Sequence, residues 1–253
     1  MITKLEIDKL VEKYETSDFI KDDPIQFPHR FTKKEDIEIA GFISSLVAYG
    51  KREVFIKKLN ELFNIAQNEP YNFIVNFEPK ILGDFNYCFG KPQDFVQIFQ
   101  ILQNLYKKDG GLEELFKYGY ENPVNNNIFI PVTDYFYTRI LNEKVSGFSN
   151  MIPDARKNSA MKRMCMLLRW FVRDGVVDLG IWDFMPKSDL LIPLDTHVAR
   201  ISRELGLLTR HTNDYKSVLE ITNNLRKYDL YDPIKYDFAL FGYGVNHTNK
   251  KKN

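Results

Sequence analysis

Apolar residues recur at helical spacing along most of the chain, and no other feature of the sequence constrains the fold as strongly. In one segment, Phe55, Leu59 and Leu62 fall on a single helix face. The same periodicity predicts helices over residues 5–14, 35–49, 52–67, 92–106, 112–118, 132–141, 159–173, 198–205, 215–225 and 234–241. Strand-like runs, at 127–130 and 190–192, are short and isolated. The sequence therefore predicts an all-α protein.

Three segments lack the helical pattern. Residues 22–30 contain two prolines and are predicted to form a loop. Residues 174–193 form a long connection, which Trp182 and Phe184 are expected to anchor. Residues 247–253 are predicted to be a flexible basic tail.

Size and charge limit the classes of protein that this chain can belong to. A chain of 253 residues can bury a full core as one large domain or as two lobes. Its 20 Phe and 14 Tyr indicate a folded protein. The formal net charge of +1 excludes a globally basic protein, so that any binding of nucleic acid must come from a local patch.

Cysteine and histidine usage argues against a metal centre. The two cysteines, Cys88 and Cys165, are too few for a disulfide framework or for a four-cysteine zinc or iron–sulfur site. Cys165 lies in an apolar run and is expected to be a buried thiol. None of the four histidines has metal-ligand spacing with another. We expect no metal, no cofactor and, without a secretory signal or a long apolar stretch, a soluble cytoplasmic protein.

Residues 155–173 carry basic side chains and no acidic residue. On a helix, Lys162, Arg169 and Arg173 share one stripe, and the other faces are apolar. This stripe either faces a cleft or a polyanion, or belongs to a core helix whose long side chains reach solvent. Asn158 or Ser159 is predicted to cap the helix, after a turn that either holds a phosphate or is an ordinary capped turn.

A second feature is an aspartate at the start of a helix. Asp195 follows the apolar residues Ile192 and Leu194 and precedes a helical run that Gly206 ends. Asp195 is either an N-cap or a fixed carboxylate of an active site. In the last predicted helix, Asp237 lies among apolar residues and is expected to pair with a buried Arg or Lys.

These two segments resemble the helix–hairpin–helix DNA glycosylases, which include endonuclease III and the 8-oxoguanine glycosylases. Residues 153–160 are similar to the hairpin of that superfamily, although Asp154 and Arg156 replace its glycines. Residues 194–200, Leu-Asp-Thr-His-Val-Ala-Arg, resemble its aspartate motif closely.

A more specific resemblance spans nearly the whole chain. The chain is identified as a member of a bacterial family of uncharacterised proteins, domain of unknown function 2400. The residues that carry the resemblance are Pro28-His29-Arg30-Phe31, Ala40-Gly41-Phe42-Ile43, Lys162-Arg163, Leu168-Arg169-Trp170, the Asp195 motif, Asp232-Pro233 and Lys235 to Gly242.

The lysine departs from the endonuclease III pattern. Asn158 stands where that enzyme has its Schiff-base lysine, and Lys162 follows one helical turn later on the same face. The wider separation of Lys162 from Asp195 is similar to that in the archaeal 8-oxoguanine glycosylases. Lys157 is the alternative amine.

The resemblance implies a single glycosylase-like unit with two lobes, 35–150 and 1–34 plus 151–246. It implies a monomer that acts on double-stranded DNA with a flipped damaged base such as 8-oxoguanine, with or without lyase activity. The alternatives are a DNA-binding protein that keeps the fold without the chemistry, and an enzyme acting on another nucleic acid or a nucleoside.

The resemblance also implies roles for individual residues. Lys162 is the expected nucleophile and Asp195 the carboxylate that stabilises positive charge on the sugar. The expected nucleic-acid contacts are Arg156, Lys157, Ser159, Arg163, His197 and Arg200. The expected base-pocket residues are Phe42, Tyr49 and Trp170, for each of which core packing is the alternative. The catalytic hypothesis requires Lys162 and Asp195 to face each other.

Overall fold

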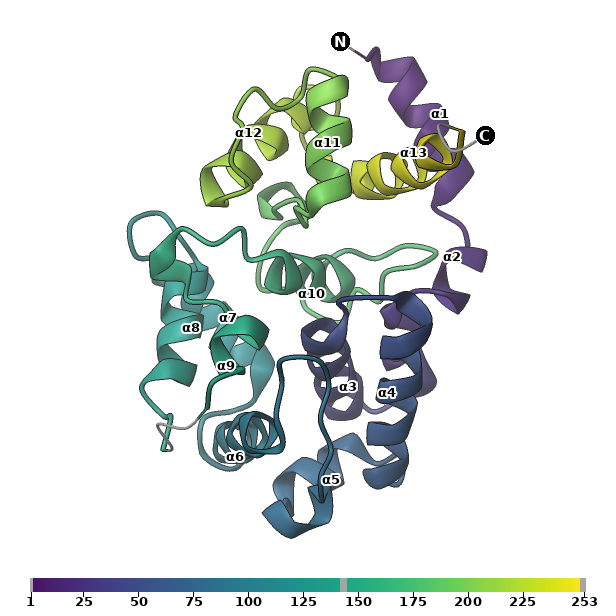
Figure 1. Ribbon diagram of the computed structural model, residues 1–253. Helices are drawn as coiled ribbons and strands as arrows, with labels where there is room; N and C mark the ends of the chain where they lie inside the picture. Colours follow the sequence, from purple (N-terminus) through teal and green to yellow (C-terminus); the bar gives the residue numbers. More distant parts are fainter. Residues whose placement is uncertain (1, 142–144, 251–253) are drawn as a thin grey trace. The chain divides into compact units, whose positions relative to one another are not determined.

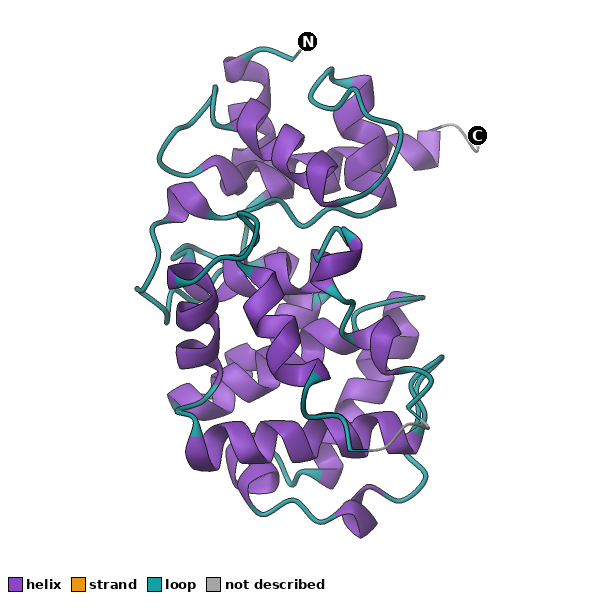
Figure 2. Cartoon of the chain, turned by 90° about the vertical axis from the view of Figure 1, so that its left-hand side faces the viewer, coloured by secondary structure: helices purple, strands orange, loops and turns teal. Residues whose placement is uncertain are grey.

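The computed structural model describes residues 2–141 and 145–250, which form helices joined by turns and loops (Figure 1). The described residues contain isolated bridges but no strand, as the colouring of Figure 2 shows. The prediction of an all-α protein is therefore confirmed.

The two strand-like runs are not strands, and in each run a side chain accepts a hydrogen bond from one backbone N–H group. Asn127 Oδ1 accepts a hydrogen bond from the N–H of Phe129, at 2.9 Å, where a helix begins. The N–H of Ile192 donates to Thr222 Oγ1 at 3.1 Å. Residues 190–192 are thus extended and buried without pairing to another strand.

The chain divides into two compact units, Asp23–Lys157 and Met1–Asp22 with Asn158–Asn253. The division differs from the predicted lobes mainly at residues 23–34, which the prediction places in the lobe containing the N-terminus. In the structure these residues carry two short 3-10 turns, η1 (Pro24–Gln26) and η2 (Pro28–Arg30), that pack on the first long helix of the unit Asp23–Lys157.

The unit Asp23–Lys157 is a cluster of helices around an aromatic core. Its further elements are α3 (Lys34–Val47), α4 (Arg52–Ile65), α5 (Pro70–Val75), η3 (Pro79–Leu82), α6 (Pro92–Lys108), α7 (Leu112–Glu121), α8 (Phe129–Tyr137), α9 (Phe148–Met151) and η4 (Ala155–Lys157). The helix α3 is buried from Ile37 to Val47, which explains its nearly unbroken apolar sequence. Pro92 occupies the first turn of α6, as predicted.

The other unit joins the N-terminal helix to the C-terminal part of the chain. It contains α1 (Lys4–Tyr14), α2 (Asp18–Lys21), α10 (Lys162–Val172), η5 (Lys187–Asp189), α11 (Thr196–Glu204), α12 (Tyr215–Leu225), η6 (Pro233–Lys235) and α13 (Tyr236–Lys250). Helices α1 and α13 lie side by side (Figure 1). Gly242 permits this approach, since a Cβ there would clash with the ring of Tyr14.

The long connection between α10 and α11 is anchored as expected. Trp182 is buried, its N–H donates to the carbonyl of Phe171 at 2.7 Å, and the two rings meet edge to face with centroids 4.8 Å apart. Phe184 lies half-buried beside Trp182. Burial of these rings holds a segment that has little regular structure of its own.

Three predictions about helix boundaries are wrong. The helix predicted over residues 132–141 spans Phe129–Tyr137. The helix predicted from residue 159 begins at Lys162, because Met161 adopts a left-handed conformation with φ of 50°. At the other end of the chain, α13 runs to Lys250, so residues 247–250 are helical rather than part of a flexible tail. Residues 251–253 lie outside the described part of the chain.

Candidate functional site

Asp195 caps a helix, as one of its two interpretations predicted. Its backbone is extended, and Oδ1 accepts hydrogen bonds from the N–H groups of His197, at 2.9 Å, and Val198, at 2.8 Å. The first N–H groups of a helix have no partner within it, so this carboxylate satisfies two of them in α11. The cap uses Oδ1 and leaves Oδ2 for a different contact.

That contact is Lys162, the first residue of α10. Its Nζ lies 3.2 Å from Asp195 Oδ2, with the two side chains 37% and 19% exposed. The amine and the carboxylate therefore face each other, as the catalytic hypothesis requires. Both groups remain partly accessible to a ligand.

The electrostatic setting of this pair is uneven. The positive end of a helix dipole stabilises an anion and destabilises a cation. Asp195 lies at the positive end of α11, and Lys162 lies at the positive end of α10. The dipole of α11 therefore favours the Asp195 charge, and the charge of Lys162 is balanced by the carboxylate 3.2 Å away.

The turn before α10 is not capped as predicted. Met161 holds the N-cap position without a side-chain hydrogen bond, and neither Asn158 nor Ser159 caps the helix. Ser159 Oγ instead accepts a hydrogen bond from the N–H of Met161 at 3.4 Å. The carbonyl of Asn158 accepts from the N–H of Tyr215 at 3.1 Å, which ties the turn to the start of α12.

The basic stripe of α10 divides into two parts. Lys162 reaches the surface, but Arg169 and Arg173 are buried. Arg169 Nε lies 3.2 Å from Asp178 Oδ1, and Arg173 Nη1 lies 2.9 Å from Asp178 Oδ2. The two arginines therefore face neither a polyanion nor solvent. They are buried together with carboxylates of the same protein.

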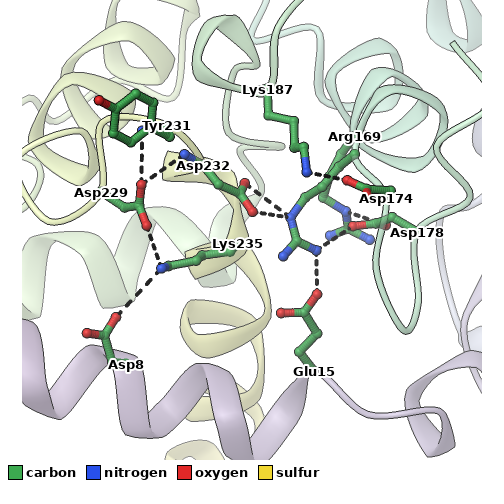
Figure 3. A network of polar contacts seen from close by, with 11 residues as sticks. Asp8, Glu15, Arg169, Asp174, Asp178, Lys187, Asp229, Tyr231, Asp232 and Lys235 are labelled. Carbon is green, nitrogen blue, oxygen red and sulfur yellow. Dashed lines mark hydrogen bonds and ion pairs between the residues drawn. The ribbon is translucent and has the colours of Figure 1, made fainter. Parts of the chain in front are cut away.

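More carboxylates complete this buried network. Arg169 also pairs with Asp237. Arg173 pairs with Glu15 and with Asp232, two of the carboxylates that Figure 3 labels. The pairing of Asp237 with a buried base is confirmed. Burial lowers the pKa of Arg173, but the surrounding carboxylates outweigh it and raise that pKa overall.

Asp237 is the buried carboxyl most affected by the candidate site. Burial raises its pKa to about 6, against the opposing effect of Arg169. The negative charge of Asp195 raises this pKa further, and the positive charge of Lys162 lowers it. Asp237 is thus electrostatically connected to both residues of the surface pair.

The expected nucleic-acid contacts are distributed over both units. Arg156 and Lys157 are exposed residues of η4, and Arg156 Nε donates to Asp134 at 2.9 Å. In the other unit, His197 is exposed and Arg163 is half-buried. Ser159 and Arg200 are also half-buried, and Arg200 Nη1 lies 2.7 Å from Glu204.

Two of the three expected base-pocket residues are core residues. Phe42 is fully buried in a stack with Phe136, with ring centroids 5.5 Å apart. Trp170 is also fully buried, and its Nε1 has no hydrogen-bond partner among the described residues. A base could reach either ring only after a rearrangement of the core.

Tyr49 differs from those two residues because it is half-buried. Its ring stacks on Phe89, with centroids 4.4 Å apart, and Phe89 is 43% exposed. The hydroxyl of Tyr49 donates to the carbonyl of Tyr87 at 2.9 Å. No sequence signal marks Phe89, because its place beside Tyr49 depends on a contact between separate loops.

No group of side chains suited to a metal ion occurs in residues 2–141 and 145–244, whose side chains the structure describes. Nor does any helix in this described part combine the length and the apolar character needed to cross a bilayer. Cys165 is buried, as expected, and burial together with the nearby Asp237 raises the pKa of its thiol.

Comparison with known proteins places the chain in a family without assigning an activity. No curated protein and no solved structure matches it. One family model matches residues 23–246, which include Lys162, Asp195 and Asp237. The chain belongs to the family described as Protein of unknown function (DUF2400).

Proposed function

We propose that this protein is a DNA base-excision glycosylase in which Lys162 is the nucleophile and Asp195 the stabilising carboxylate. The proposal includes the helix–hairpin–helix character of residues 153–172. The observation that carries it is the 3.2 Å distance between Lys162 Nζ and Asp195 Oδ2. The two groups come from different helices, yet they meet where both are partly exposed.

The pair supplies what cleavage of an N-glycosidic bond requires. Unprotonated Nζ attacks C1′ of the damaged nucleotide, and the electron pair of the C1′–N bond leaves with the base, which takes up a proton. Positive charge on the sugar is stabilised by the Asp195 carboxylate, which its capping hydrogen bonds hold in place. The proton of the amine is then transferred to O4′ as the C1′–O4′ bond opens, which leaves an iminium between Nζ and C1′.

The proposed substrate is double-stranded DNA with a damaged base, such as 8-oxoguanine, turned out of the stack. In this proposal, the first N–H groups of α10 and His197, which is exposed, contact the phosphates of the DNA. The enzyme needs no metal for this reaction. β-Elimination from the iminium would add lyase activity.

Borohydride trapping tests the proposal, because hydride reduces the iminium to a stable amine that joins protein to DNA. We expect an adduct with at least one duplex from a panel that carries different base lesions. Lys162→Gln should abolish the adduct, and Lys157→Gln, the control for the alternative amine, should still form it when DNA is supplied at saturating concentration. The absence of any adduct across the panel, or an adduct that survives Lys162→Gln, would contradict the proposal.

One observation favours a second candidate, a DNA-binding protein without catalytic activity. A carboxylate next to Lys162 stabilises its ammonium form, which is not a nucleophile. For such a protein we expect salt-dependent binding of undamaged duplex with neither base release nor an adduct.

A further inference from the structure

Tyr49 and Phe89 form a stack of aromatic rings at the surface of the unit Asp23–Lys157. Their ring planes lie within 16° of parallel, with the centroids 4.4 Å apart. Tyr87 also contacts Tyr49, with ring centroids 4.7 Å apart, and is buried. This aromatic cluster therefore extends from a buried ring, Tyr87, to Phe89, which is 43% exposed.

The two loops that carry these rings are tied to each other. The hydroxyl of Tyr49 donates to the carbonyl of Tyr87 at 2.9 Å, and the hydroxyl of Tyr87 donates to the carbonyl of Tyr49. Tyr87 and Gly90 exchange backbone hydrogen bonds of 2.9 and 2.8 Å, so that Cys88 and Phe89 form a two-residue turn. The ring of Phe89 is thus held in place before a ligand binds, which lowers the entropic cost of binding.

The exposed part of Phe89 is suited to a flat ligand. A single exposed apolar side chain is common on protein surfaces, but this ring is supported by a second ring parallel to it. Tyr49 covers one face of the Phe89 ring, so the edge and the opposite face account for its exposure. A planar aromatic group such as a nucleobase can extend the stack on that face.

Amines lie close to both rings in the chain. Lys51 follows Tyr49 by two residues, and Lys91 follows Phe89 by two residues. Both lysines are exposed, and neither forms an ion pair with a residue that the structure describes. Positive charge beside an aromatic platform matches the alternation of phosphates and bases along a nucleic-acid strand.

The acidic residues nearby leave this positive charge in place. Asp84 is the one acidic residue of the two loops, residues 48–51 and 83–91, which contain two lysines. Asp94 follows Lys91 closely but is buried. Its carboxylate accepts hydrogen bonds from the backbone N–H groups of Lys91, at 2.8 Å, and Gly147, at 3.0 Å. The carboxylate of Asp94 is therefore occupied by backbone donors and does not pair with the Lys91 amine.

We propose that the Tyr49–Phe89 stack binds an unpaired base of a single-stranded nucleic acid, and that Lys51 and Lys91 contact the phosphates beside that base. In a duplex each base already stacks on its neighbours, so only an unpaired base can offer its face to Phe89. Stacking of this kind accepts any base and selects no particular lesion. The site goes beyond the proposed function, because its binding requires no cleavage of a glycosidic bond.

Fluorescence anisotropy of the full-length protein with labelled single strands tests the proposal. Oligodeoxyadenylate and oligoriboadenylate are both used, since DNA and RNA share bases and phosphates. We expect Phe89→Ala to raise the Kd of at least one strand about 10-fold. The matched control is Tyr118→Ala, because it removes another exposed ring of the same unit, 58% exposed, and should leave the Kd unchanged. A Kd that Phe89→Ala does not change for either strand, or that both variants raise equally, would overturn the proposal.

Phe89→Trp provides a second test that keeps a flat ring in the turn. We expect this variant to retain the affinity of the wild type. A base stacked on the new indole should quench its fluorescence, measured as the difference from the wild type, whose Trp170 and Trp182 are buried. Binding without this quenching would show that no base stacks on the platform and would overturn the proposal.

Salt dependence tests the part of the two amines. We expect Lys51→Ala and Lys91→Ala each to reduce the slope of log K against log salt concentration by about 0.7, the value for one phosphate contact on a single strand. Lys107→Ala is the matched control, because Lys107 is exposed in the last turn of α6. It lies about 24 Å along that helix from Lys91 and should leave the slope unchanged. Unchanged slopes in both test variants would overturn the assignment of phosphate contacts.

Discussion

Asp195 contacts Lys162 with one carboxylate oxygen and caps α11 with the other. Oδ1 is bound by two backbone N–H groups, so Oδ2 is held toward the amine. The capping and catalytic interpretations of Asp195 therefore do not exclude each other. Capping fixes the orientation that catalysis would use.

Replacement of Asp195 by Asn should separate the two roles. Asn is also a good N-cap, so we expect the free energy of unfolding to fall by less than about 1 kcal/mol. The loss of the carboxylate charge should reduce the rate of borohydride trapping about 100-fold or more. Chemical denaturation and trapping measure the two effects.

The matched control is Asp214→Asn, because Asp214 caps α12 through the N–H of Ser217 at 3.0 Å. Asp214→Asn should be trapped at the wild-type rate. If Asp195→Asn is trapped at the same rate, Asp195 has only a capping role.

Loss of Arg173 should destabilise the protein strongly. Arg173→Met leaves Asp178, Glu15 and Asp232 without their shared cation, and we expect a loss of about 3–5 kcal/mol in the free energy of unfolding. Urea denaturation measures this loss. As a control, Lys21→Ala removes an exposed ion pair with Asp18 and should leave the midpoint unchanged. Similar midpoints for the two variants would mean that the buried network does not stabilise this unit.

The raised pKa of Asp237 should make stability depend on pH. Burial raises this pKa from 3.8 to about 6, so the folded state binds its proton more tightly than the unfolded state. The resulting contribution to stability is present at low pH and is lost as the pH rises from about 4 to about 6. Over that window we expect the stability of the wild type relative to Asp237→Asn to fall by about 2–3 kcal/mol. Parallel pH profiles for the two proteins would contradict this.

Lys157 should contribute to DNA binding through phosphate contact. It is exposed on η4, beside Arg156, whose charge is already paired with Asp134. We expect Lys157→Ala to weaken binding equally for all sequences and to reduce the slope of log K against log salt concentration by about 1. Fluorescence anisotropy at several salt concentrations measures this slope. Lys80→Ala, which removes an exposed cation outside the expected set, should leave the slope unchanged.

The charged residues show how far the sequence could predict the site. An aspartate in an apolar helix must be compensated, so a buried base was expected for Asp237 and is present. Its identity could not be predicted, because Arg169 lies 68 residues away in the chain. Asp178 was missed altogether, since nothing in its short turn indicates that two arginines enclose it.

For the aromatic residues too, the sequence predicted part of the outcome and the tertiary structure decided the rest. Helical spacing correctly made Phe42 and Trp170 candidates for the core, but it could not exclude a role in a base pocket. Their complete burial, in contrast to the half-buried Tyr49, depends on which elements cover them. Spacing along one helix carries no information about those covering elements.

The amino-acid sequence by itself determined the helical class of the protein, most of its helices, the cap at Asp195 and the family. These properties depend on periodicity, capping and motifs within a few residues of one another. Only the tertiary structure decided which charges meet. It brought Lys162 to Asp195 and enclosed Arg169 and Arg173 among carboxylates. The physical reason is that burial and ion pairing depend on packing between helices that are distant in the sequence. In the sequence, Lys162, Arg169 and Arg173 form one basic stripe, and only the packing exposes Lys162 and buries the two arginines.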